Sequence, residues 1–204
     1  MPKVIHDIEV YKNTLKTILM HFSNVPEIQI NEFVGLFSME TFKKKSVIIS
    51  PNNIVNNKFY FIAKGLVRIY YTNDNKEIIS DFKEDNSFFM NGYTLFTGLP
   101  NIDYHEAMED TVCLTATYND IEKLAKEYHA LEHLGRKMVE NYYAAYLKEN
   151  YNKLFLSAEE RYAVFVKERA SIMNKVSLRY VASHLGIAPE TLSRLRARYQ
   201  SIKS

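Results

Sequence analysis

The chain has 204 residues and a formal net charge of +2, and 47% of its residues are hydrophobic and 25% charged, a balance that is ordinary for one or two folded domains. No apolar run approaches the length of a membrane span and residues 1–10 lack the layout of a signal peptide, which predicts a cytoplasmic protein with no membrane partner. Cys113 is the only cysteine, so intrachain disulfides and cysteine-only metal clusters are excluded.

The N-terminal part predicts helices followed by short strands. Residues 11–37 read as one or two helices broken around Asn24–Pro26. Runs rich in β-branched and aromatic residues then predict strands at Val47–Ile49, Phe59–Ile62, Leu66–Tyr71, Ile78–Ile79 and Thr111–Thr117. Turn signals separate several of them, at Pro51–Asn53, Lys64–Gly65 and Thr72–Asn75. Many short strands with regular turns favour a small antiparallel barrel or jelly roll.

From residue 119 the chain reads as helical to its end. Two pairs have the capping-box spacing of a helix start, Asn119 with Glu122 and Ser157 with Glu160. Between them, residues 131–155 predict one long helix. Its apolar residues recur every three or four positions, at Leu131, Leu134, Met138, Tyr142 and Ala145. A helix this long must bury such a stripe, either against its own domain or, as we expect, in a dimer interface.

The strongest local pattern covers residues 177–199 and predicts a helix-turn-helix. Ser177 can cap a first helix whose buried face is Leu178, Val181, Ala182 and Leu185. Gly186 falls where the connecting turn needs a left-handed backbone, and Pro189 suits the first turn of the next helix. Leu192 and Leu195 then bury this second helix against the first.

The polar face left on the second helix suits double-stranded DNA. Residues 157–204 hold nine Lys/Arg against four Asp/Glu, whereas residues 1–156 hold seventeen against twenty, although a basic solvated helix gives a similar count. Arginine can bridge guanine O6 and N7 and glutamate can accept from cytosine N4, so the candidates for base contact are Glu190, Thr191, Arg194 and Arg198. The candidates for phosphate contact are Ser177, Arg179, Ser193 and Arg196.

Three stretches resemble the Crp/Fnr family, the cyclic-AMP receptor protein family of transcription regulators. Phe59–Val67 is similar to its strand–turn–strand signature, Asn75–Ile79 to the following hairpin and Glu190–Arg194 to its recognition-helix core. The resemblance implies an α+β fold: a cyclic-nucleotide-binding-like β-roll (jelly roll) over residues 1–127, a dimerisation helix and hinge over 128–156 and a winged helix-turn-helix over 157–204. It also implies a homodimer on an inverted repeat, with RNA polymerase as a further partner. Pro189 departs from the family, in which an arginine often stands at that step.

The cassette with which the family binds a cyclic nucleotide is altered. A glycine–glutamate pair opens a short helix there and an arginine follows, whereas this chain has Met90-Asn91 at the pair and no Lys or Arg between Lys83 and Lys123, where eight acids lie. A phosphate would lack its fixed cation, so we expect no cyclic-nucleotide cofactor and no control by cyclic AMP in the usual way. Residues that either line another effector pocket or form core are Phe89, Asn91, Gly92, Tyr93, Tyr104 and His105.

Other classes of function have weaker support. His129 and His133 are four apart on a predicted helix but lack a third metal ligand, and a haem would have to use His21, His105 or Cys113, so we expect no metal. A cupin-type metalloprotein or enzyme needs clustered His and Glu on neighbouring strands, where His105 is the only histidine, and we expect no enzyme activity. A ligand-binding β-roll that no longer binds DNA is the remaining alternative, against which the retained arginines argue.

Overall fold

Two helices precede the first strand, α1 (Pro2–Phe22) and α2 (Glu27–Gly35), which confirms the predicted break near Pro26. Helix α1 begins nine residues earlier than the sequence predicted. The computed structural model describes residues 2–52, 57–74 and 76–203. Asn53 and Asn75, each predicted in a turn, lie outside the described residues.

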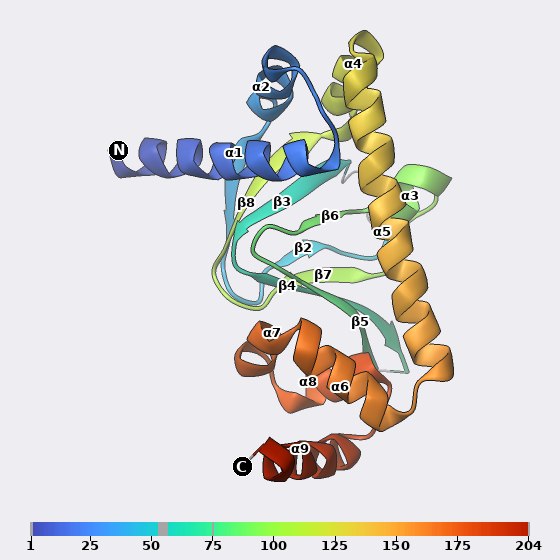
Figure 1. The fold of residues 1–204 in the computed structure, drawn as a ribbon. Coiled ribbons are helices and arrows are strands. Elements are labelled where there is room, and N and C mark those ends of the chain that lie inside the picture. Colours follow the sequence, from blue (N-terminus) through green and yellow to red (C-terminus); the bar gives the residue numbers. More distant parts are fainter. Residues whose placement is uncertain (1, 53–56, 75, 204) are drawn as a thin grey trace. The chain divides into compact units, whose positions relative to one another are not determined.

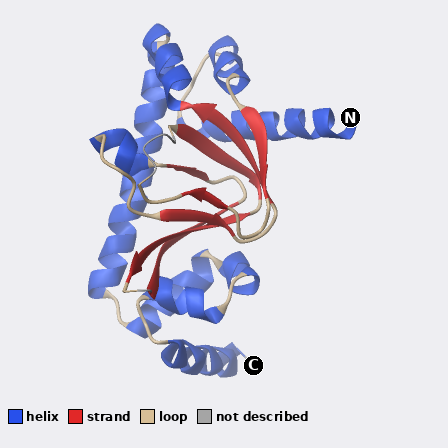
Figure 2. Ribbon diagram, turned by 180° about the vertical axis from the view of Figure 1, so that it is seen from behind, coloured by secondary structure: helices blue, strands red, loops and turns tan. Residues whose placement is uncertain are grey.

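The strands form two four-stranded sheets, drawn in red in Figure 2, which confirms the predicted jelly roll. One sheet has the order β1-β8-β3-β6, with β1 at Ser38–Phe42, β8 at Thr111–Thr117, β3 at Lys58–Lys64 and β6 at Phe88–Met90. The other has the order β2-β7-β4-β5, with β2 at Val47–Ile49, β7 at Tyr104–Ala107, β4 at Leu66–Asn73 and β5 at Lys76–Glu84. The sequence did not predict the short strands β1, β6 and β7.

Contacts divide the chain into two units, each of which collects segments far apart in sequence. The first unit contains Met1–Ile69 and Lys83–Tyr142, and the second contains Tyr70–Phe82 and Tyr143–Ser204. The outer part of the β4–β5 hairpin therefore belongs with the C-terminal helices.

The first unit holds two apolar clusters. One joins α1 and α2 to β3, β8 and the long helix α5 (His129–Phe155), and its buried members include Leu15, Phe37 and Phe61. The other lies among the strands and contains Ile49, Tyr60, Ile62, Val67, Phe89 and Cys113. Two shorter helices complete this unit, α3 (Gly92–Thr97) and α4 (Tyr118–Glu127). Thr117 caps α4 by accepting from the Asp120 amide, so the capping box predicted at Asn119 is wrong by two residues.

The second unit contains the C-terminal helices α6 (Ala158–Glu168), α7 (Ala170–Lys175), α8 (Leu178–Leu185) and α9 (Pro189–Lys203), labelled in Figure 1. Ser157 and Glu160 form the predicted capping box at the start of α6. Residues 157–203 contain helices and no strand, so the winged form of the helix-turn-helix is corrected to a helical one over these residues. Among the described residues, no helix is both long and apolar enough to cross a membrane.

The long helix was predicted correctly, but its predicted dimer stripe must be corrected. Leu131 and Leu134 are buried in the chain's own core and Met138 packs against that core, so these three side chains are not available to a partner. Tyr142 and Ala145 lie further along α5 at the same helical spacing, and both are exposed, so for these two the dimer contact stays a prediction. The apolar period of the helix was predicted correctly, but its first three residues pack in the protein's own domain.

A different face of α5 exposes large apolar side chains. Four-residue steps join Val139, Tyr143, Leu147, Tyr151 and Phe155, and Tyr142, Tyr146 and Leu154 lie beside them; each is at least 48% exposed. We call these eight residues the exposed aromatic face of α5. Its rings contact one another, Tyr143 with Tyr146 and Tyr151 with Phe155.

Candidate nucleic-acid interface

Helices α8 and α9 form the predicted helix-turn-helix. Val181, Ala182 and Leu185 of α8 are buried, as is Leu192 of α9, which confirms most of the predicted contact face. Leu178 and Leu195 are half-buried.

The turn between the helices has the predicted chemistry at its glycine and its proline. Gly186 ends α8 with a left-handed backbone, φ 64°. The Ile187 amide donates to the Ala182 carbonyl at 3.0 Å, which satisfies a carbonyl at the end of the helix. Pro189 is the first residue of α9. At the start of α8, however, Ser177 stands in the N-cap position without a side-chain capping bond, so this prediction is wrong. Its carbonyl instead accepts from the Tyr180 and Val181 amides.

The predicted DNA-contact side chains lie on open surface of these two helices. Those that are exposed are Ser177, Arg179, Glu190, Ser193, Arg194, Arg196 and Arg198, and Thr191 is half-buried. Arg194 Nη2 donates to Thr191 Oγ1 at 3.5 Å, which connects two of the predicted base-contacting residues. An arginine that is exposed and only weakly held can exchange this contact for a base edge or a phosphate.

Arg198 has a stronger intramolecular partner that the sequence did not reveal. Its Nη1 lies 3.1 Å from Oε2 of Glu159, in the first turn of α6. Both side chains are exposed, so the pair contributes little to stability. It does hold the Arg198 guanidinium beside α6, which makes Arg194 the better candidate for base contact.

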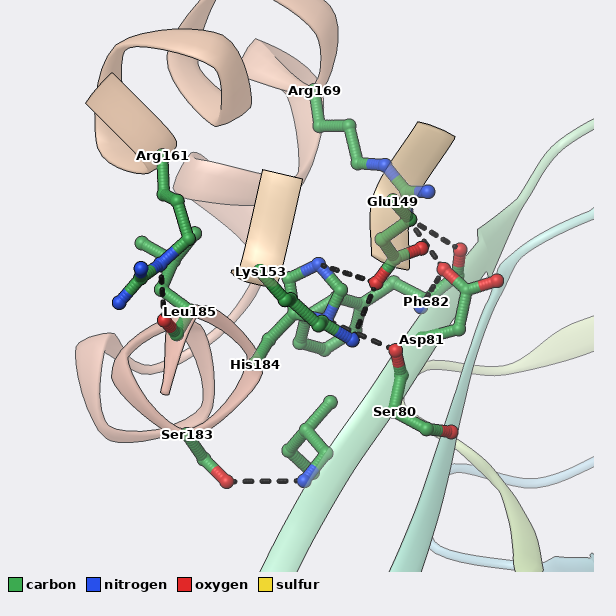
Figure 3. Close-up of polar contacts among 11 residues, drawn as sticks. Ser80, Asp81, Phe82, Glu149, Lys153, Arg161, Arg169, Ser183, His184 and Leu185 are labelled. Atoms are coloured by element: carbon green, nitrogen blue, oxygen red, sulfur yellow. Dashed lines mark hydrogen bonds and ion pairs between the residues drawn. The ribbon is translucent and has the colours of Figure 1, made fainter. Parts of the chain in front are cut away.

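Another feature that the sequence did not reveal is the attachment of α8 to the β4–β5 hairpin, drawn in Figure 3. Ser183 and His184 both contact the backbone of β5, and Arg169 binds Asp81 on the same strand. The contact between His184 and Ser80 joins residues 104 positions apart. No local pattern in the sequence identifies such a partner.

Arg161 also connects segments within the second unit. Its Nε donates to the Leu185 carbonyl at 3.0 Å and its Nη1 to the Leu156 carbonyl at 2.7 Å. These carbonyls belong to the ends of α8 and of the long-helix segment, where carbonyls lack partners in their own helix. Leu156, at the end of the segment predicted as dimerisation helix and hinge, is therefore connected through Arg161 to the helix-turn-helix within one compact unit.

The predicted effector-pocket residues differ in their burial and in their neighbours. Phe89 is buried and stacks on Tyr60, with ring centroids 4.6 Å apart, and the buried His105 ring lies 5.4 Å from Phe89. Tyr104 is half-buried on β7, and Tyr93 is exposed. Asn91 is buried and caps α3 by accepting from the Thr94 amide, with Gly92 opening that helix.

A cavity of about 260 Å³ does lie beside α3. Its lining residues are Asn57, Lys58, Met90, Asn91, Thr94, Leu95 and Gly98, so one predicted pocket residue reaches it. Lys58 is ion-paired with Glu40 at 2.5 Å.

Buried charge inside the roll is internally compensated. Arg68, which is 4% exposed and was not singled out in the sequence, pairs with Glu106 at 3.0 Å. Asp103 accepts from His105 Nε2 at 3.2 Å, and the hydrogen bond and charge of His105 lower the pKa of Asp103 despite the opposing effect of burial. Among the described residues, no group of three or more His, Cys, Asp or Glu is placed to hold a metal.

Comparison with known proteins gives one match to a family model. Residues 39–128 match the family model of the cyclic nucleotide-binding domain. No curated protein sequence matches the chain.

Solved structures of similar fold cover most of the chain. FixK2 from Bradyrhizobium japonicum is 20% identical with a TM-score of 0.68, and the match covers 82% of this chain and 86% of that one. A CooA mutant from Carboxydothermus hydrogenoformans is 20% identical with a TM-score of 0.67, covering 84% and 79%. A Eubacterium rectale chain described as a transcriptional regulator of the Crp/Fnr family is 17% identical with a TM-score of 0.66, covering 87% and 84%.

The chain therefore has the fold seen in Crp/Fnr-type regulators, and its residues 39–128 match the cyclic nucleotide-binding domain in sequence. The resemblance predicted from three short motifs is confirmed.

Proposed function

We propose that this protein is a sequence-specific DNA-binding transcription regulator of the Crp/Fnr type. The observation that carries the proposal is the open polar face of α9 on a complete helix-turn-helix. Arg194 and Arg196 lie on α9 with Glu190 and Ser193, and all four side chains are exposed. Arginines on the second helix of such a motif can reach guanine edges in the major groove.

The regulator acts as a homodimer through the exposed aromatic face of α5. Eight large apolar side chains on one helix form a patch of the kind that marks an interface rather than free surface. A second copy of the same helix offers an identical face, so a two-fold pairing buries both. Two recognition helices presented in this way favour an inverted repeat as the target.

The regulator is not controlled by cyclic AMP in the usual way. The space among the strands is filled by the side chains of Tyr60, Phe89 and His105. The buried cation Arg68 is already paired with Glu106. Met90-Asn91 stands in place of the glycine–glutamate pair, directly before α3. A cyclic phosphate would have to displace an internal ion pair before it met a free cation.

Three further parts of the proposal rest on the resemblance and on the sequence: a cytoplasmic location, RNA polymerase as a protein partner and the absence of enzyme activity. None of the three depends on which DNA sequence the protein binds.

Selection of bound duplexes from random DNA tests the proposal. We expect one enriched inverted repeat, with an affinity that falls steeply as salt rises because bound phosphates release counterions. The double variant Arg194→Ala/Arg196→Ala should lose the enrichment. Arg136→Ala/Lys137→Ala removes the same charge from α5 and should keep it. Addition of cyclic AMP should leave the affinity unchanged. Failure to enrich any sequence contradicts the regulator function.

A further inference from the structure

The outer edge of β5 is bound by a side chain rather than by another strand. β5 is the last strand in the order β2-β7-β4-β5, so one edge of its backbone needs other hydrogen-bond partners. Ser183 of α8 supplies them: its Oγ accepts from the Ile79 amide at 3.0 Å and donates to the Glu77 carbonyl at 3.1 Å. The first helix of the helix-turn-helix is thereby bonded to the hairpin within the second unit.

Arg169, between α6 and α7, adds a charged contact to the same strand. Its Nη1 donates to Asp81 Oδ1 at 2.6 Å and to the Phe82 carbonyl at 3.2 Å. The Phe82 amide also donates to Asp81 Oδ1, at 2.8 Å, which fixes the carboxylate toward the arginine. The contact is partly buried, so water screens it less than it screens the exposed pairs of this protein.

His184 completes the attachment and supplies its imidazole group. It is 7% exposed, and the rings of Phe82 and Phe165 each lie 5.5 Å from its own. Its Nδ1 lies 3.1 Å from the Ser80 carbonyl. Because a carbonyl can only accept, Nδ1 carries the hydrogen and Nε2 is the site of any second proton. Nε2 lies 3.8 Å from Oε1 of Glu149 on α5.

We propose that Ser183, His184 and Arg169 form a proton-sensitive clasp on the β4–β5 hairpin, which holds the helix-turn-helix in its DNA-binding arrangement while His184 is neutral and loosens when His184 gains a proton. The part of this inference that concerns DNA rests on the proposed function. The part that concerns the clasp is a property of the free protein.

The charges around His184 oppose one another, and burial decides the direction. Glu149 on α5 and Asp81 on β5 favour the protonated ring, whereas Arg169 and Lys153 disfavour it. Lys153 also lies 2.8 Å from the Glu149 carboxylate and so partly neutralises it. Burial between the two phenyl rings is the largest effect, and it lowers the pKa of His184 below its ordinary value of 6.5.

The sign of the pH dependence follows from this pKa. In the open arrangement, the exposed ring binds a proton near its ordinary pKa, whereas in the closed arrangement it binds the proton more weakly. The closed clasp therefore has its full stability above about pH 6.5. Below that value it becomes less stable relative to the open arrangement as the pH falls. The equilibrium constant for opening can rise by at most about tenfold per pH unit, because a single proton is taken up.

Loosening the clasp reaches the DNA-binding face through α8. Val181, Ala182 and Leu185 pack α8 toward α9, while its neighbours Ser183 and His184 bind the hairpin. When these two contacts are lost, α8 keeps its apolar partner but loses its attachment to β5. The orientations available to α9 then broaden, and specific binding weakens because fewer molecules present the correct one.

Measurements on the free protein test the clasp. NMR titration should show His184 gaining its proton below pH 6.5, and the protection of the Ile79 amide against hydrogen exchange, corrected for intrinsic rates, should fall over the same range. A His184 that titrates at or above 6.5, or an Ile79 protection that is independent of pH, would overturn the clasp. Both readouts use the wild-type chain, so they hold whether or not a variant folds.

A matched pair of variants tests the link to DNA. In His184→Asn, the side-chain amide can still donate to the Ser80 carbonyl but does not titrate in this range. We expect it to keep its affinity for the selected duplex between pH 7.5 and 5.5, while the wild type weakens by several-fold relative to it. His129→Asn, which removes an exposed histidine of α5, should behave like the wild type.

Equal pH dependence in wild type and His184→Asn would overturn the link, even if the clasp itself titrates as expected. If no duplex is bound at any pH, the proposed function has failed, and the NMR titration and hydrogen exchange still decide whether the clasp exists.

Discussion

Arg194 is the side chain whose loss should reveal sequence reading most directly. It is exposed on α9, and its described contact is a long one to Thr191. Arg194→Ala should weaken binding to the selected duplex by ~1–3 kcal/mol and relax the preference at one base position. Competition between duplexes that differ at single positions measures both effects. Arg136→Ala is the matched control, and an Arg194→Ala protein with unchanged base preference would show that Arg194 contacts phosphate or nothing.

Two glycines test how local backbone geometry contributes to stability. Gly65 has φ 131°, and a Cβ there would lie 2.8 Å from the Thr111 Cα. Gly186 has φ 64°, and nothing lies within 4 Å of its Cβ position. We expect Gly186→Ala to cost about 1 kcal/mol of unfolding free energy, since only the left-handed backbone opposes it. Gly65→Ala should cost more than about 2 kcal/mol, because the backbone of β8 cannot move aside. Urea unfolding measures both, and equal losses would contradict this account.

At the scale of elements, patterns that depend on neighbours along the chain could be predicted from the sequence. Thr111–Thr117 was predicted with the correct bounds because β-branched residues dominate it. The turn at Gly186 and the start of α9 at Pro189 follow from the backbone preferences of those two residues alone. Such features need no knowledge of the rest of the fold.

Features that depend on distant partners were missed. Strand β6 has three residues and pairs with β3, and strand β7 has four residues. Neither strand contains a long run of β-branched or aromatic residues that would identify it. The period of α5 was visible, yet it could not show that Leu131 and Leu134 face α1 and α2 rather than a second chain. The binding of Ser183 to β5 was equally hidden, because it joins residues 104 or more positions apart.

The exposed aromatic face of α5 leads to a prediction about association. Tyr146→Glu with Leu147→Glu places two charges within this face and should dissociate the proposed dimer, because an interface cannot readily bury unpaired carboxylates. Sedimentation should then give one chain per particle. Asn141→Glu, exposed on the opposite side of α5, adds a charge outside the face and should leave the dimer intact. A wild type that sediments as a monomer at all concentrations contradicts the dimer.

For the whole molecule, paired chains predict a fixed distance between the two DNA half-sites. If two copies associate along α5, each copy holds one α9, and the recognition helices of such dimers meet half-sites about one helical turn apart. Insertion of five base pairs between the half-sites turns one of them to the opposite side of the duplex. The affinity should then fall to that of a single half-site, because one chain of the dimer loses its contacts. Titration of both duplexes measures this difference in affinity. The two titrations need the same salt concentration, because phosphate contacts depend strongly on salt. Undiminished binding to the lengthened site would mean that each chain binds DNA independently, and the aromatic face of α5 would then need another partner.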